Sequence, residues 1–268
     1  MSVKPKRENT LQSSAMDRML EVTARAEREH FWFRGFRAFV RPLLDRASEG
    51  RRPLRILDCG CGTGNNIALL LRPYGRVFGI DLTWTGLAFA KQAGVTGIAQ
   101  ATAARLPFGD ACFDLVTSFD MLQCVPDAFE ADAAAEMARV LRPGGHLLVN
   151  VSALPWLRGD HSILTHEVRR YDRGRLQRLL EGAGFELRRL TYTNASLVPL
   201  LATSRFLQRR RGLVSSDQDA AAAREMSVPS APVNAIMTGV LAIEARLVRG
   251  IDLPVGSSLL CLAEKPKR

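Results

Sequence analysis

Residues 56–64 read ILDCGCGTG, and this stretch decides the fold. An apolar run ending in three alternating glycines is typical of a strand that enters a tight loop in a parallel α/β sheet. A second apolar run, VFGID at residues 77–81, ends in Asp81, seventeen positions after the last glycine. Glycines let the backbone approach a ligand without a Cβ in the way, and a carboxylate can accept hydrogen bonds from a ribose diol. The two runs together predict a site for an adenosine-containing cofactor.

The spacing of the glycines distinguishes between cofactors. Dinucleotide folds use G-x-G-x-x-G, in which the third glycine lies in a helix whose N-terminus faces a pyrophosphate. Here Asp58 precedes Gly60, Gly62 and Gly64 in the pattern D-x-G-x-G-x-G. An acid at that position would repel a pyrophosphate but can hold an ammonium group, directly or through water. S-adenosylmethionine carries an ammonium and no phosphate, so the pattern favours it.

With this motif the chain resembles the class I S-adenosylmethionine-dependent methyltransferase superfamily. Four further segments occur in the same order as in the branch that includes the ubiquinone and menaquinone biosynthesis methyltransferases. They are LPF at 106–108, FDLV at 113–116, DMLQCVPD at 120–127 and VLRPGGH at 140–146. Two less specific stretches, EHFWFRG at 29–35 and HEVRRY at 166–171, are similar to motifs of a bacterial subgroup. The resemblance covers most of the chain and implies methyl transfer.

Apolar runs alternate with helix-like segments along the first 152 residues, which predicts a parallel sheet with right-handed crossovers. The runs lie at 54–58, 77–81, 97–101, 113–119 and 146–152, and the helix-like segments at 65–72, 84–93 and 128–141. A helix near 172–182 and strands near 185–193 and 257–264 follow. The resemblance implies a Rossmann-like α/β fold: a seven-stranded sheet of order 3-2-1-4-5-7-6, with the last strand antiparallel and helices on both faces.

A chain of 268 residues with 47% hydrophobic content can bury a full core, and we expect a single domain over 1–268. Its parts would be an N-terminal helical cap at 1–50, a cofactor-binding core at 51–153 and a substrate-side half at 154–268. The long insertion 194–256 contains two predicted helices, at 196–211 and 233–248, and a polar run at 215–232 that we expect to be mobile. These helices could cover the substrate, form a dimer surface, contact a membrane or simply pack on the sheet.

Cofactor contacts are assigned from the motif positions of the family. The residues so implied are Asp58, Cys59, Gly60, Gly62, Asp81, Leu82, Thr102, Ala103 and Phe119. Asp58 would face the methionine ammonium, Asp81 the ribose and Leu82 the adenine. Thr102 stands where the family usually has an acid that reaches the adenine amino group. We therefore expect weaker adenine recognition at this position.

The catalytic residues are less clearly indicated by the sequence. The family pattern D-V-L-E-H has lost its Glu and His, which are Gln123 and Cys124 here. His161 and His166 lie past the end of the fifth strand, where ligands bind in open α/β sheets, so they are the candidate general bases. Positioning can supply roughly 7–11 kcal/mol against roughly 3–5 kcal/mol from a base, so a dedicated base can also be absent.

Acceptor-binding residues are expected beside the same strands. Asp120 follows the fourth strand and should line the methyl-transfer side. Arg169, Arg170 and Tyr171 would bind an anionic group on the substrate, or merely pair with neighbouring acids.

Charge and composition limit the partners. The formal net charge is +10, but the arginines are spread along the chain without interleaved aromatic residues, which argues against nucleic acid. No [ND]-P-P-Y motif occurs either. Peripheral contact with anionic lipid and oligomer formation both remain open. The N-terminus lacks an apolar leader and no eighteen-residue apolar run occurs, so we expect a cytoplasmic protein.

The five cysteines are expected to be reduced thiols, with no metal site, because a metal or disulfide at Cys59 and Cys61 would occupy the cofactor's place. The leading hypothesis is an S-adenosylmethionine-dependent methyltransferase acting on an oxygen, nitrogen or carbon of a small-molecule or lipid-linked acceptor. The alternatives are a non-catalytic binding module or scaffold with the same fold, and a nucleic-acid methyltransferase.

Overall fold

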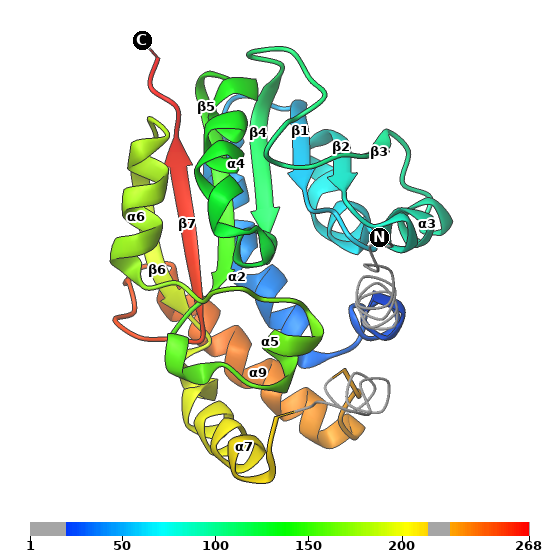
Figure 1. Ribbon diagram of the computed structural model, residues 1–268, viewed down its shortest axis with the longest axis vertical. Helices are drawn as coiled ribbons and strands as arrows, with labels where there is room; N and C mark the ends of the chain where they lie inside the picture. Colours follow the sequence, from blue (N-terminus) through cyan, green and yellow to red (C-terminus); the bar gives the residue numbers. More distant parts are fainter. Residues whose placement is uncertain (1–19, 214–225, 268) are drawn as a thin grey trace, which may run out of the picture.

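The computed structural model describes residues 20–213 and 226–267. Its centre is a seven-stranded sheet with the order β3-β2-β1-β4-β5-β7-β6, which confirms the predicted order (Figure 1). The strands are β1 (Leu54–Cys59), β2 (Gly75–Asp81), β3 (Ile98–Gln100), β4 (Phe113–Phe119), β5 (Leu141–Ser152), β6 (Glu186–Thr193) and β7 (Ser258–Glu264). The first five pair in parallel, and β7 is antiparallel to both β5 and β6, as expected.

Helices cover both faces of the sheet, so its central strands are apolar on both sides. The helices are α2 (Phe31–Ala47), α3 (Trp84–Gln92), α4 (Asp127–Val140), α5 (Asp160–Leu164), α6 (Arg173–Gly182), α7 (Val198–Arg211) and α9 (Ala231–Val248). One buried cluster joins α2, α3 and α9 to the sheet through residues such as Leu44, Ile56 and Leu241. The other joins α4 and α6 to the opposite face, through residues such as Leu57 and Met137.

Several boundaries differ from the sequence-based prediction. The predicted helix over 65–72 is a π-helix at Ile67–Leu71 followed by a 3-10 turn, η2, at Arg72–Tyr74. Strand β3 is shorter than expected, and β5 begins at Leu141 because this residue pairs with Phe113 across an irregularity in the ladder. At the edge that faces the predicted cofactor site, the ends of β1 and β3 each differ from the prediction by one residue.

Helix α9 of the insertion is an integral part of the packing. It lies against α2 so closely that a Cβ added to Gly35 would come within 2.4 Å of the Leu241 side chain. The Asn234 side chain accepts a hydrogen bond from the Phe31 amide at 2.8 Å. Buried Glu244 accepts hydrogen bonds from the Ala195 and Ser196 amides, both at 2.9 Å. Most of the polar run expected to be mobile, at 215–225, lies outside the described residues.

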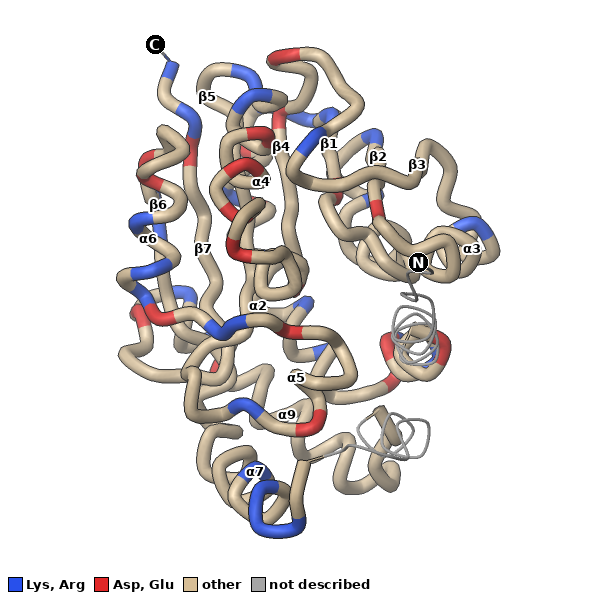
Figure 2. Tube along the Cα trace, viewed as in Figure 1, with Lys and Arg blue, Asp and Glu red and all other residues tan. Residues whose placement is uncertain are grey.

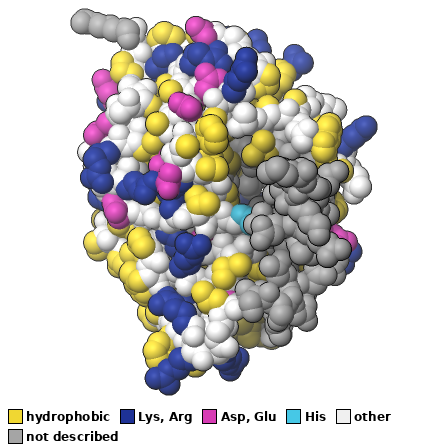
Figure 3. Space-filling model, viewed as in Figure 1, with side chains coloured by type: hydrophobic (Ala, Val, Ile, Leu, Met, Phe, Trp, Pro, Cys, Tyr) yellow, Lys and Arg dark blue, Asp and Glu magenta, His cyan; other side chains and the backbone are white. Residues whose placement is uncertain are grey.

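The carboxyl ends of the parallel strands point toward the part of the molecule that holds α5, α7 and α9 (Figure 1). Positive charge is distributed over the whole described chain, with a short concentration at the end of α7 (Figure 2). Figure 3 shows basic and hydrophobic side chains interspersed at that end of the molecule. Helix α9 has the length and mean hydropathy, 1.3 over 18 residues, that would allow it to cross a bilayer. Its packing against α2 assigns it instead to the surface of the domain.

Candidate functional site

The glycine loop, residues 60–64, connects β1 to the following helix and is fixed to β2. The Gly60 and Cys61 amides both donate to the Ile80 carbonyl, at 2.8 and 2.9 Å. All three glycines have positive φ, between 48° and 78°, a region that other residues rarely adopt. A Cβ on Gly60 would also lie 2.6 Å from the Met121 side chain, so the loop after β4 abuts the glycine loop. The predicted motif therefore forms one close-packed turn at the carboxyl edge of the sheet.

Asp81 holds the glycine loop to the start of α3. Its Oδ2 accepts the Gly62 amide at 2.9 Å, and its Oδ1 accepts the amide and hydroxyl of Thr83 at 2.8 and 2.6 Å. Thr83 is the N-cap of α3 and accepts the Gly86 amide. A carboxylate offers about four acceptor positions, so about one remains on Oδ2 for a ligand hydroxyl. Asp81 therefore has a structural role that the sequence did not indicate, beside room for a ribose contact.

Asp58, the residue before the last of β1, is a buried acid, 2% exposed. The Thr117 hydroxyl of β4 donates to its Oδ1 at 2.6 Å. Burial raises the pKa of Asp58 to about 7, and the nearby Asp81 and Glu27 add to the increase. A cation bound beside these acids would be strongly favoured, whereas an anion would be repelled.

Glu27 is a further acid at the glycine loop, and no sequence pattern indicated it. Its Oε2 accepts the Thr63 hydroxyl at 2.5 Å and the Asn65 amide group at 2.6 Å. The side chain is 8% exposed, and burial raises its pKa. One acid in a charged N-terminal segment cannot be distinguished from its exposed neighbours by pattern alone. Only the tertiary contact between this segment and the loop reveals its position.

The other predicted cofactor residues lie around the same edge. Leu82 is 65% exposed and follows Asp81 directly, so its side chain is free to pack on a ligand. Ala103 is buried, and Thr102 is exposed with its hydroxyl accepting the Ala104 amide at 3.2 Å. Phe119 packs edge-on against Phe36 of α2 with 5.1 Å between ring centroids.

The cysteines near this edge are thiols. All five cysteines of the chain are free, and burial raises the pKa of Cys59 and Cys61 above the usual range. Burial also raises the pKa of Cys124 to about 12, so this thiol stays protonated and is a poor nucleophile.

A polar cluster follows the ends of β4 and β5 and consists of Asp120, Gln123, Ser152 and Glu167. The Gln123 amide group donates to Asp120 Oδ1 at 3.3 Å and to Ser152 Oγ at 3.1 Å, and Ser152 Oγ donates to Glu167 Oε1 at 2.6 Å. Asp120 has φ of 55°, a left-handed conformation that is often found at functional sites. Residue 120 is partly open to solvent, but protein atoms surround the carboxylate. Their desolvating effect, with a contribution from the charge of Glu167, raises the pKa of Asp120 to about 6.

His161 and Arg170 adjoin the polar cluster through Glu167. Burial alone would raise the pKa of Glu167, but the charges of Arg170 and His161 outweigh it and the pKa is lowered. The attraction is mutual, so Glu167 stabilises a positive charge on His161. Arg170 Nε and Glu167 Oε2 lie 3.9 Å apart, and neither atom makes a hydrogen bond to a described group. Both atoms are buried, and their opposite charges face each other.

The comparisons with known proteins agree with this geometry. A family model described as a methyltransferase domain matches residues 57–149. The ubiquinone/menaquinone biosynthesis C-methyltransferase UbiE of Stutzerimonas stutzeri is 31% identical over 183 residues, which are 55% of this chain and 70% of that protein. The chain belongs to the class I S-adenosylmethionine-dependent methyltransferase family.

A further sequence relative and a solved structure of the same fold are also similar to this chain. A probable S-adenosylmethionine-dependent methyltransferase of Mycolicibacterium smegmatis is 32% identical over 162 residues, 59% of this chain and 61% of that protein. The crystal structure of an S-adenosylmethionine-dependent methyltransferase from Mesorhizobium loti has a TM-score of 0.51 and 21% identity, and covers 83% of this chain and 96% of its own. The chain thus spans 61% of the length of the Mycolicibacterium smegmatis protein and 70% of the length of UbiE.

The residues of the site fit S-adenosylmethionine. The backbone of the glycine loop at Gly62 is not covered by a Cβ of its own, Asp81 keeps an acceptor for a hydroxyl, and buried Asp58 favours a cation. Among the described residues, no arginine or lysine donates a hydrogen bond to Asp58 or Asp81. These two carboxylates therefore suit an ammonium and a diol better than a phosphate.

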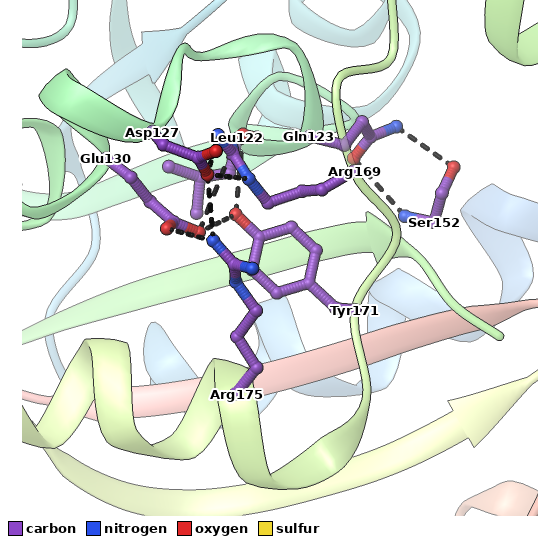
Figure 4. Close-up of polar contacts among 8 residues, drawn as sticks. All are labelled: Leu122, Gln123, Asp127, Glu130, Ser152, Arg169, Tyr171 and Arg175. Atoms are coloured by element: carbon purple, nitrogen blue, oxygen red, sulfur yellow. Dashed lines mark hydrogen bonds and ion pairs between the residues drawn. The ribbon is translucent and has the colours of Figure 1, made fainter. Parts of the chain in front are cut away.

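Arg169 and Tyr171 are structural, and the expectation that they bind substrate is not supported (Figure 4). Tyr171 is fully buried, and its hydroxyl donates to Glu130 of α4. Arg169 donates through Nε and Nη2 to Asp127 at 3.0 and 2.8 Å and through Nη1 to the Leu122 carbonyl at 2.9 Å. Arg169 and Tyr171 therefore fix the loop before α6 to the start of α4, and only Arg170 of the three faces the polar cluster.

His166 has a different environment from His161. It adopts a positive φ of 54° at the turn that ends α5, and its amide donates to the Ile163 carbonyl at 3.1 Å. Of the two predicted bases, His161 is the one whose charge acts on Glu167. The structure therefore distinguishes two histidines that the sequence treated alike.

Proposed function

We propose that this methyltransferase transfers the methyl group of S-adenosylmethionine to an oxygen, nitrogen or carbon of a small-molecule or lipid-linked acceptor. The observation that carries the proposal is the adjacency of two sites. The glycine loop abuts Met121, and Met121 lies between Asp120 of the polar cluster and the rest of the loop after β4. A cofactor held at the glycine loop would thus lie next to a cluster of polar groups that can hold an acceptor.

Asp58, Asp81 and the glycine loop would hold the cofactor. Asp58 would face the ammonium group, Asp81 would accept a ribose hydroxyl, and the backbone of Cys59, Gly60 and Gly62 would lie along the methionine portion. Leu82, Thr102 and Ala103 would contact the adenine, and Phe119 would line the methyl-transfer side. When bound, S-adenosylmethionine supplies an electrophilic methyl group on a positively charged sulfur.

His161 is the proposed general base, with Glu167 as a positioning residue. A base that removes a proton from the acceptor becomes positively charged, and Glu167 would stabilise that charge. Arg170 would bind an anionic group on the acceptor, because its Nε makes no hydrogen bond to a described group. Asp120, whose pKa is raised to about 6, would contact the acceptor from the end of β4 and is the alternative base.

The test measures turnover of labelled cofactor with a metabolite extract, and then with the acceptor that it identifies. We expect His161→Asn to lower kcat by about 10²–10⁴-fold while cofactor affinity stays within a few-fold. His166→Asn is the matched control and should retain kcat within about tenfold. Glu167→Gln should shift the acidic limb of the pH profile without changing cofactor affinity.

Equal losses in the two histidine variants would contradict the role of His161. Losses below tenfold in both would show that positioning alone drives the transfer. Cofactor binding without turnover of any acceptor would instead favour a binding module. The cytoplasmic location is likewise a proposal, and cell fractionation of the tagged full chain would test it.

A further inference from the structure

A groove between α2 and α9 is lined by arginine and alanine alone. Its volume is about 420 Å³, and its charged residues are Arg28, Arg34, Arg37, Arg41, Arg246 and Arg249. Three alanines, Ala38, Ala242 and Ala245, complete the lining. No acidic residue takes part. The groove is formed by two helices that are far apart in the sequence, so only the packing of α9 on α2 creates it.

These six arginines form no salt bridge with any described residue. Among the residues that the structure describes, none of the six lies within 4 Å of a carboxylate. Arg139, Arg142 and Arg188, which lie elsewhere on the chain, are each paired with at least one acid. Six like charges around one small groove repel one another unless an anion neutralises them.

The pKa of Arg37 is affected by this repulsion. Burial lowers its pKa, and the neighbouring charges of Arg41 and Arg34 lower it further, while Glu27 acts in the opposite direction. Arg37 donates to the Glu27 carbonyl at 2.9 Å, and the Glu27 side chain in turn accepts from the glycine loop and Asn65. Arg37 is therefore part of the framework, and Arg41 also donates to the protein, to the Leu69 carbonyl at 3.3 Å.

We propose that this groove binds a phosphate group. Guanidinium groups match the geometry of phosphate oxygens and can bind them in a bidentate manner, and the alanines keep the floor of the groove open to the ligand. A volume of about 420 Å³ accommodates a head group or a small phosphorylated molecule but not a nucleic-acid duplex.

The surroundings of the groove favour an anionic phospholipid as the source of the phosphate. Ile243, Leu247 and Ile251 are 59%, 56% and 54% exposed and alternate in sequence with Arg246 and Arg249. Arginine next to exposed aliphatic side chains is typical of surfaces that contact lipid head groups and the upper part of the acyl chains. A soluble phosphorylated compound would use the same arginines without these apolar neighbours.

The experiment uses the purified full chain and two probes. One probe is co-sedimentation with phosphatidylcholine vesicles that contain or lack phosphatidylglycerol, and the other is calorimetric titration with pyrophosphate. The groove variant is Arg34→Gln/Arg246→Gln/Arg249→Gln, which leaves Arg37 in place. The matched control is Lys91→Gln/Arg105→Gln/Arg178→Gln, which removes the same number of charges outside the groove. Melting temperatures of both variants establish that they fold.

We expect the wild-type chain to bind vesicles that contain phosphatidylglycerol and not those of phosphatidylcholine alone. The groove variant should bind about 100-fold more weakly, whereas the control should stay within a few-fold. Pyrophosphate binding without vesicle binding, lost only in the groove variant, would support the phosphate site and assign it to a soluble ligand. Binding to neither probe, or an equal loss in the control variant, would overturn the proposal.

Discussion

Replacing Asp81 by alanine separates the structural role of this residue from its ligand role. The change removes three hydrogen bonds, one to the Gly62 amide and two to Thr83. Leaving the Gly62 amide without its acceptor costs about 1–3 kcal/mol, and with the bonds to Thr83 we expect a loss of about 2–4 kcal/mol in the free energy of unfolding. For a chain of this size the melting temperature of the free protein should fall by about 4–16 °C.

The same change should weaken cofactor binding by more than the structural loss explains. A hydrogen bond to a charged acceptor contributes about 1.5–3 kcal/mol, and a ribose diol makes one or two of them. A loss of about 2–4 kcal/mol corresponds to a dissociation constant for S-adenosylhomocysteine raised about 30- to 700-fold. Calorimetric titration gives this constant, and thermal and urea unfolding of the ligand-free protein give the stability.

Thr83→Val is the matched control for Asp81→Ala. It removes the hydroxyl that donates to Asp81 and caps α3, but leaves the carboxylate in place. We expect a stability loss of about 1–2 kcal/mol with cofactor affinity within about threefold of the wild type. The reasoning is refuted if Asp81→Ala binds the cofactor as tightly as the wild type. It is also refuted if Thr83→Val loses as much affinity as Asp81→Ala.

Three further predictions concern the pH dependence of binding and the packing of the domain. Folding raises the pKa of Asp58 to about 7, so ionisation of this acid opposes folding and the free protein should lose stability as the pH rises from about 4 toward 7. An ammonium ligand favours the ionised form, so cofactor affinity should rise over the same range and level off above about pH 7.5, and a flat profile, measured by titration calorimetry, would contradict the contact. Tyr171→Phe should cost about 1–2 kcal/mol in urea unfolding, because it removes the hydroxyl that donates to Glu130 Oε1, yet keep kcat/KM within a few-fold; a large loss of activity would restore the substrate role. Gly35→Ala should cost about 1–3 kcal/mol by overpacking against Leu241, and the double variant with Leu241→Ala should show coupling, whereas additive losses in a double-mutant cycle would argue against close contact of α2 and α9.

The sequence by itself determined the fold class and the cofactor edge. The conformations of the glycine loop follow from a local pattern, because three glycines and two flanking acids carry their meaning in their spacing, whereas the order of the strands follows from the resemblance to the family. Asp58 and Asp81 lie at the carboxyl ends of adjacent parallel strands, and such strand ends always meet at one edge of a sheet.

The tertiary structure alone decided which polar residues act together. In HEVRRY at 166–171, the side chains of neighbouring residues contact different parts of the domain. Arg169 and Tyr171 turn toward the acids of α4, whereas Glu167 and Arg170 turn toward the polar cluster. Pattern gives the residue types of such a loop but not their directions.

Contacts between segments far apart in the chain were equally beyond the sequence. Glu27 reaches the glycine loop, and the arginines of α2 meet those of α9, across separations of 36 and of about 200 residues. Neither contact leaves a periodic signal, because each depends on how whole helices pack rather than on local spacing. The local patterns of this chain therefore predict the edge of the sheet at which the cofactor binds. The packing of its helices determines which other side chains lie near that edge.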